Sequence, residues 1–264
     1  MNRRGGVLMY HDVLGAHDSG TPGIGAEVYK ISRERFSAHL SALRTAFPEG
    51  PALWRCGPVE QPRVPFMLTF DDGGQSATEV ARLLETLGWR AHFFITTSWI
   101  GQRGFLSAAA IRALHEQGHV VGSHSVTHPP VMSALSQSQL QLEWNDSAAR
   151  LSDIIGARVG TASVPGGYVS PAVVATAAAA GIEVLWTSEP RVGIQRREGV
   201  AVLGRFAVYH DTMPWEAVAL AGEKPWAQRW QLAQWFARKP AKALLGGLYP
   251  TVRRHLLAWS AQRG

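Results

Sequence analysis

Short apolar runs alternate with helix-like segments along most of this chain, and this alternation restricts the possible fold more than any other feature. Serines stand before most of the helical segments and glycines after them, which is how helices commonly begin and end. Alternating strands and helices predict a parallel sheet, and about seven strands predict an α/β barrel or near-barrel. The predicted strands are 6–10, 66–70, 91–95, 119–123, 159–163, 182–186 and 200–209, the last interrupted by Gly204.

The helices predicted between these strands are 32–47, 76–87, 107–118, 136–155 and 171–181. A stretch rich in Pro and Gly, 48–65, is expected to be a long surface connection. Ser76 and Glu79 have the spacing of a capping box, in which a serine caps the helix and a glutamate reaches back to it. With the helix capped in this way, the preceding Asp71 and Asp72 are left for another role.

The size and composition of the chain indicate a soluble globular fold. At 264 residues it can form one large domain or two small ones, and 46% hydrophobic with 17% charged residues argues against disorder. Cys56 is the only cysteine, which excludes an internal disulfide and a cysteine-based zinc site. No apolar segment reaches the roughly 20 residues that a membrane span needs.

Positive charge is concentrated at the C-terminal end. Residues 223–264 contain eight Lys or Arg and one Glu, a segment charge of +7, whereas the whole chain has a net charge of +6. The remaining residues therefore sum to −1, and a nucleic-acid partner for the main domain is not expected. We accordingly divide the chain into a domain, 1–222, and a basic helical extension, 223–264.

Polar residues follow several of the predicted strands. In barrels of parallel strands the chemistry gathers at the carboxyl ends of the strands. That rule collects on one rim His11, Asp71, Asp72, His124, Pro165, Gly166, Gly167, Trp186 and His210.

Two histidines on this rim have a spacing that suits metal binding. His124 and His128 are four residues apart just after a strand, so both imidazoles can point to one side of a single turn. An isolated pair of this kind is more often a hydrogen-bonded surface pair. Beside Asp71 and Asp72 on the same rim, we favour a site with two His and one Asp that leaves positions open.

The adjacent carboxylates then have separate uses. One binds the metal, and the other takes a proton from metal-bound water, whose pKa falls to about 7. A nearby cation would also relieve the repulsion between two neighbouring negative charges. A general acid is still required, because an amide nitrogen leaves poorly unless it is protonated.

Three motifs together resemble those of the polysaccharide deacetylases of the NodB-homology type, carbohydrate esterase family 4. They are "LTFDDG" from Leu68, "GSHSVTH" from Gly122 and "VPGG" from Val164, and the resemblance covers about 6–210. It implies a distorted (β/α)7 barrel that removes N-acetyl groups from amino sugars of a glycan, using a divalent metal, usually zinc. It also implies that Asp72, His124 and His128 are the metal ligands and that Asp71 is the general base.

The resemblance leaves two candidates for the general acid. Most of the family uses a histidine near the C-terminal end of the chain, and "VYHD" would supply His210 in that role. The N-terminal "VLMYHDV", however, resembles the branch that contains the poly-N-acetylglucosamine deacetylases, in which the acid follows the first strand. We favour His11.

The third motif departs from the family at one position. Ser163 stands where the family has an arginine that steadies the base, so either another basic residue takes that part or the base is tuned differently. Pro165, Gly166 and Gly167 are expected to bind substrate, with a backbone N–H near Gly166 facing the oxyanion. Trp186 either walls the acetyl pocket or belongs to the core.

The extension contains a segment, 225–247, in which aromatic and cationic residues alternate. Such a helix either packs on the barrel through its aromatic side or contacts an anionic membrane peripherally. Because the start of the chain lacks a long apolar run, we expect a cytoplasmic protein, acting at or near the inner membrane surface. The alternatives to a deacetylase are a hydrolase of small C–N substrates and an inactive carbohydrate-binding relative.

Overall fold

The computed structural model describes residues 5–14, 19–20, 24–54, 66–167, 169–222 and 225–245. In this part of the chain, nine strands form one sheet in the order β11-β1-β4-β5-β6-β7-β8-β10-β9. Every neighbouring pair is parallel except β10 and β9. Cys56, 55–65 of the predicted connection and 246–264 of the extension lie outside the described residues.

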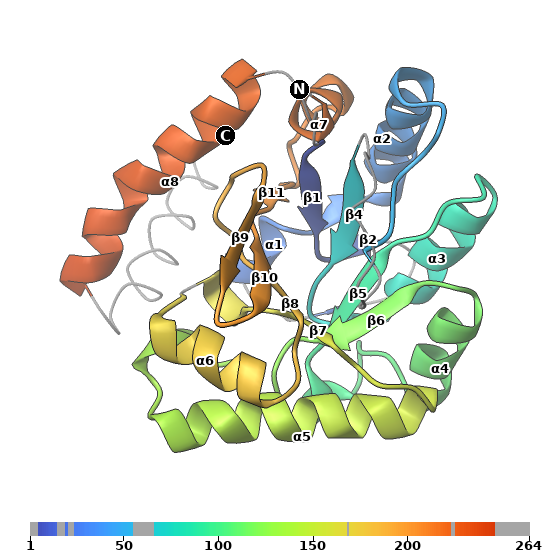
Figure 1. Ribbon diagram of the computed structural model, residues 1–264. Coiled ribbons are helices and arrows are strands. Elements are labelled where there is room, and N and C mark those ends of the chain that lie inside the picture. Colours follow the sequence, from blue (N-terminus) through green and yellow to red (C-terminus); the bar gives the residue numbers. More distant parts are fainter. Residues whose placement is uncertain are drawn as a thin grey trace.

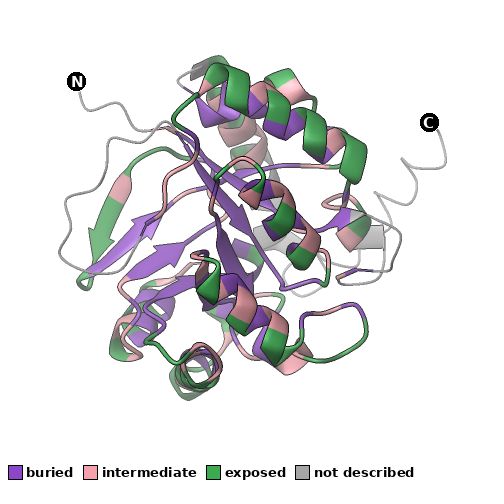
Figure 2. Ribbon diagram, turned by 90° about the vertical axis from the view of Figure 1, so that its right-hand side faces the viewer, coloured by how far each residue is buried: buried purple, intermediate pink, exposed green. Residues whose placement is uncertain are grey.

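All seven predicted strands are present, and the predicted α/β barrel class is confirmed. The first six are β1 (Val7–Tyr10), β4 (Met67–Phe70), β5 (His92–Ile95), β6 (Val120–Ser123), β7 (Thr161–Ser163) and β8 (Val184–Trp186), and the seventh forms two strands, β10 (Val200–Leu203) and β11 (Phe206–Ala207). The antiparallel β9 (Ile194–Arg197) and the separate pair of β2 (Val13–Leu14) and β3 (Ile31–Ser32) were not predicted. Three of the four residues of β9 are exposed, so it lacks the apolar pattern of the other strands (Figure 2).

Helices surround this sheet on its outer side. In Figure 1, α7, α2, α3, α4, α5 and α6 follow one another around the strands, and α8 lies beside the β9–β11 region. The helices are α1 (Ile24–Glu27), α2 (Arg33–Ala46), α3 (Ala77–Glu85), α4 (Ala108–Glu116), α5 (Gln137–Ile155), α6 (Pro171–Ala179), α7 (Pro214–Ala221) and α8 (Pro225–Leu245). Short 3-10 turns occur at η1 (Thr97–Trp99), η2 (Met132–Ala134) and η3 (Pro165–Gly167).

Serine caps begin four of the predicted helices, but Ser76 does not act as one. The side chains of Ser32, Ser107, Ser136 and Ser170 accept hydrogen bonds from the backbone at the start of their helices. Ser76 instead donates to Asp12 Oδ1 at 2.8 Å and accepts from the N–H of Val13 at 3.2 Å. The predicted capping box at Ser76 is therefore wrong, because a buried carboxylate distant in sequence competes for the same hydroxyl.

The last predicted strand bends and connects the two ends of the sheet. Its first part, β10, pairs with β8, whereas its second part, β11, pairs with β1. Only Gly204 and Arg205 separate the two parts, so the sheet must curl until β1 and β10 nearly meet. A Cβ on Gly204 would lie 2.3 Å from the carbonyl oxygen of Glu189, and only glycine allows the backbone to pass there.

The core lies on both sides of the curled sheet. Alternate strand residues face the helices, as with Leu8, Leu68 and Phe93, which pack with buried residues of α2, α3 and α4. The other residues face the inside of the barrel, where Phe94 and Trp186 belong to a separate apolar cluster. Figure 2 shows the buried strands between helices that are buried on one side and exposed on the other.

The boundary that we drew at residue 222 falls between α7 and α8, and α8 occupies most of the predicted basic helical segment. Within the described residues, no helix combines the length and the apolar character that crossing a bilayer requires.

Candidate active site

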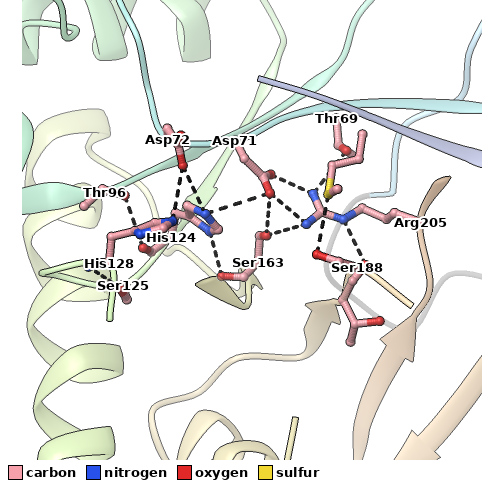
Figure 3. A network of polar contacts seen from close by, with 12 residues as sticks. Thr69, Asp71, Asp72, Thr96, His124, Ser125, His128, Ser163, Ser188 and Arg205 are labelled. Carbon is pink, nitrogen blue, oxygen red and sulfur yellow. Dashed lines mark hydrogen bonds and ion pairs between the residues drawn. The ribbon is translucent and has the colours of Figure 1, made fainter. Parts of the chain in front are cut away.

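Asp72, His124 and His128 come together at the carboxyl edge of the sheet. Asp72 follows β4, and the two histidines lie in the loop after β6. His124 Nε2 is 3.3 Å and His128 Nε2 is 3.5 Å from Asp72 Oδ1, and one ligand atom from each residue lies within 4.8 Å of the others. Figure 3 shows the three side chains pointing toward one another.

The donor set and its spacing fit a divalent metal. Ligand atoms about 2.1 Å from a tetrahedral cation are separated by about 3.4 Å, close to the distances found here. Asp72 Oδ1 is buried and has no hydrogen-bond partner in the described part of the chain, which leaves it available as a ligand. His124 Nδ1 donates to the carbonyl oxygen of Ser163 at 2.9 Å, so the lone pair of this ring lies on Nε2, which faces Asp72.

The backbone around the ligands adopts left-handed conformations that side chains rarely take. Asp72 has φ 74°, Ser125 has φ 66° and His128 has φ 55°. Such conformations are unfavourable for residues other than glycine and persist where the surrounding structure holds them. They turn the Asp72 carboxylate and the His128 ring toward one point.

Glu143 on α5 holds the loop between the two histidines. Its Oε2 accepts hydrogen bonds from the backbone N–H groups of Val126 at 2.7 Å and Thr127 at 2.9 Å, and its Oε1 accepts from Thr127 Oγ1 at 2.5 Å. The Ser125 hydroxyl adds a bond from the N–H of His128 at 3.0 Å. Nothing in the sequence motif pointed to Glu143, because the contact depends on where α5 lies.

Asp71, the neighbour of the triad, is held by a buried arginine. Arg205 Nη1 donates to Asp71 Oδ1 at 2.6 Å, and Nη2 donates to Asp71 Oδ2 at 2.8 Å. Both side chains are almost fully buried, and Asp71 Oδ2 is 3.8 Å from His124 Nε2. This bidentate ion pair fixes the carboxylate beside the metal-binding group, as Figure 3 shows.

Each N–H of Arg205 has an acceptor. In addition to the two bonds to Asp71, the guanidinium donates to Thr69 Oγ1 at 3.2 Å, to Ser163 Oγ at 2.7 Å and to the Thr187 carbonyl oxygen at 3.2 Å. Ser163 in turn donates to Asp71 Oδ2 at 3.1 Å. Arg205 thus provides the basic group that is absent at position 163. Ser163 bridges the Arg205 guanidinium and the Asp71 carboxylate.

The charge of Arg205 keeps Asp71 ionised. Burial by itself would raise the pKa of this carboxyl, but the Arg205 guanidinium, followed by His124, more than offsets the effect and holds the pKa below its usual range. We did not predict Arg205 from the sequence. The sequence feature that could have revealed it is a single cation within an apolar strand segment. Such a cation requires an anionic partner once the strand is buried.

The two candidates for the general acid differ in their surroundings. The N–H of Asp71 bonds the Tyr10 carbonyl oxygen at 3.0 Å, so His11 lies next to Asp71 at the edge of β1 and β4. His11 is half-buried, and its ring centroid is 4.4 Å from that of Tyr29. His210 is exposed and lies beside Asp211, with 4.0 Å between His210 Nδ1 and Asp211 Oδ1.

The residues expected to bind substrate are divided between the rim and the core. Gly166 is exposed in η3, while Pro165 and Gly167 are buried. Trp186 is fully buried, and its indole Nε1 donates to Thr161 Oγ1 at 2.8 Å. It packs inside the barrel against Phe94 and therefore has no surface in this structure with which to wall a pocket.

A family model described as polysaccharide deacetylase matches residues 59–185, which include Asp71, Asp72, both histidines and the η3 turn. The match identifies a polysaccharide deacetylase domain in this chain. Domains of this kind are hydrolases of carbon–nitrogen bonds other than peptide bonds.

Comparisons with individual proteins find the same fold and several related sequences. The deacetylase PplD of Streptococcus pyogenes, solved in complex with acetate, has the same fold, with a TM-score of 0.67 and 17% identity over 82% of this chain and 97% of that one. YxkH of Bacillus subtilis is 23% identical over 208 residues, which are 76% of this chain and 70% of that protein. A gellan lyase of a Bacillus species is 35% identical over 103 residues, which are 39% of this chain and only 4% of that protein.

Proposed function

We propose that this protein removes acetyl groups from N-acetylated amino sugars in a polysaccharide or glycan precursor. The observation that carries the proposal is the ionised Asp71 carboxylate, which Arg205 holds beside Asp72, His124 and His128. A base next to a metal-binding group is the arrangement that hydrolysis of an amide needs. The solved deacetylase PplD, which has the same fold, contains acetate, the product that this reaction would release.

Asp72, His124 and His128 would hold a divalent cation, for which we propose zinc because two imidazoles and one carboxylate suit it. When bound there, the cation supplies an activated water molecule at neutral pH and polarises the acetyl carbonyl. The His124 ring keeps its ligand orientation through its bond to Ser163.

Asp71 acts as the general base in this proposal. Its Oδ2 lies 3.8 Å from His124 Nε2, and Ser163 and Arg205 both donate hydrogen bonds to that oxygen. These two donors fix the orientation of the carboxylate beside the metal-binding group. The backbone near Gly166 is proposed to face the oxyanion.

His11 is the proposed general acid that protonates the departing amine. The support is its place at the end of β1, next to Asp71, in contrast to the exposed His210. The N-terminal "VLMYHDV" of this chain also resembles the branch that contains the poly-N-acetylglucosamine deacetylases, in which the acid follows the first strand.

The metal content of the purified protein and acetate release from chitin oligomers test the proposal together. We expect bound divalent metal and released acetate, with both lost on Asp72→Asn and acetate alone lost on Asp71→Asn. Asp211→Asn, which changes an exposed carboxylate, is the matched control. Bound metal with cleavage only of small amides would favour the small C–N hydrolase, and glycan binding without metal would favour the inactive relative.

A further inference from the structure

One face of α8 is fixed to the edge of the sheet. The Gln231 side chain accepts from the N–H of Ala207 at 3.1 Å and donates to the Ala207 carbonyl oxygen at 2.7 Å. Ala207 belongs to β11, the edge strand, so the glutamine takes the place of a neighbouring strand. Gln228 donates to the carbonyl oxygens of Leu220 and Gly222, and Ala227 is buried. This face of the helix is therefore occupied by the barrel.

The opposite side of α8 presents tryptophans to solvent. Trp226 and Trp230, one helical turn apart, are 55% and 65% exposed. Trp215 of α7 is 56% exposed and stacks on Trp226, with ring centroids 5.9 Å apart. We call these three residues the aromatic face. Three large exposed indoles from two adjacent helices form an apolar patch, which commonly marks an interaction surface.

The helix that carries two of these tryptophans is basic in its sequence. Arg229 is exposed between Trp226 and Trp230 in the sequence. Helix α8 contains four Lys or Arg and no Asp or Glu, and the segment 223–264 carries +7. A surface that combines indoles with cations matches a partner whose outer layer is anionic and whose interior is apolar.

We propose that the aromatic face binds an anionic lipid bilayer peripherally. Tryptophan is favoured at the boundary between headgroups and acyl chains, because its ring is apolar and its N–H is polar. Lys and Arg near an anionic leaflet each add about 1 kcal/mol of attraction. The two earlier alternatives for this helix are thus compatible, since one side packs on the barrel and the other side contacts the lipid.

Charge argues against a second copy of this chain as the occupant. Two aromatic faces meeting each other would bring together two α8 helices, each with four Lys or Arg and no Asp or Glu in its sequence, which is unfavourable. The inference goes beyond the proposed function and does not depend on it, because none of the three tryptophans belongs to the candidate active site.

Flotation of the full chain with vesicles tests this surface. We expect recovery with vesicles of phosphatidylcholine and phosphatidylglycerol, and little recovery with phosphatidylcholine alone. The double variant W226S/W230S should lower the partition coefficient more than tenfold, and Arg229→Gln about fivefold. Leu142→Ser, which removes an exposed apolar side chain of 59% exposure on α5, is the matched control and should float like the wild type. Thermal unfolding of each variant checks that the fold is kept.

Equal recovery with neutral and anionic vesicles, or unchanged recovery of W226S/W230S, would overturn the proposal. A concentration-dependent dimer in light scattering that the double variant abolishes would show self-association instead. Without vesicles, acrylamide should quench the wild type more than the double variant. Equal quenching would mean that the segment 246–264 already covers the two indoles, and this outcome would also overturn the proposal.

Discussion

Arg205 and Asp71 form a bidentate ion pair between residues 134 positions apart in the chain, and every N–H of the arginine has an acceptor. In the family motif, the arginine that steadies the base stands at the position of Ser163. Here the guanidinium enters from the bend between β10 and β11, and a serine makes room for it. Asp71, the proposed base, is therefore held by a guanidinium that comes from a different strand.

Arg205→Lys should lower kcat at least tenfold and change its pH profile. Lysine keeps the charge but cannot form the two parallel bonds to Asp71. With weaker stabilisation, burial raises the pKa of Asp71, so a larger fraction of the base is protonated at a given pH. The acid limb of the profile of kcat/KM against pH should move upward. An unchanged limb would contradict the role assigned to Arg205.

His11→Ala should reduce acetate release by at least a hundredfold, because general acid catalysis contributes about 10²–10⁴. His210→Ala changes an exposed side chain and should leave turnover near that of the wild type. Steady-state rates of both variants on the same chitin oligomer decide between the two histidines. The reverse pattern would assign the acid to His210.

Glu143→Gln should weaken metal binding 10- to 100-fold, the usual cost of losing a partner that orients ligands. Gln keeps one acceptor but loses the charge that strengthens the bonds to Val126 and Thr127. Competition titration with a chromophoric chelator measures the affinity directly. Asp146→Asn, an exposed change on the same helix, is the control. Equal affinities for the two variants would show that the loop does not need this carboxylate.

His119 should make the protein less stable as the pH falls below 6.5. Burial, followed by the charges of Arg90 and His92, lowers the pKa of His119 from 6.5 to about 4. Its Nδ1 accepts the N–H of Ala91 at 3.2 Å, and protonation would remove that acceptor. Between these pKa values the unfolded chain binds a proton that the folded chain does not, so stability present above pH 6.5 is lost toward pH 4.

Urea unfolding at pH 7 and pH 4.5 measures this loss. The wild type should lose about 2 kcal/mol more than His119→Asn between the two pH values. Asparagine keeps an acceptor for Ala91 but does not titrate in this range. The comparison cancels the other titrating groups, His39 and the site residues included. Equal losses would show that His119 contributes nothing to the acid sensitivity.

The sequence alone was enough to predict the parallel strands of the main sheet, most helices and the groups that meet at the rim. Apolar runs, serine caps and glycine ends act over a few residues, so they can be recognised locally. The rule that chemistry gathers at the carboxyl ends of parallel strands then brought Asp72, His124 and His128 together before any coordinates.

The tertiary structure decided what depends on distant partners. The sheet had to curl before Arg205 could reach Asp71, and α5 had to pack before Glu143 could reach Thr127. The Ser76 hydroxyl went to Asp12 rather than to its own helix, and Trp186 was enclosed by the barrel interior. In each case a buried polar or aromatic group takes the partner that folding brings to it, because leaving it unpaired or exposed costs free energy. The spacing of residues in the sequence does not show which distant partner each group takes.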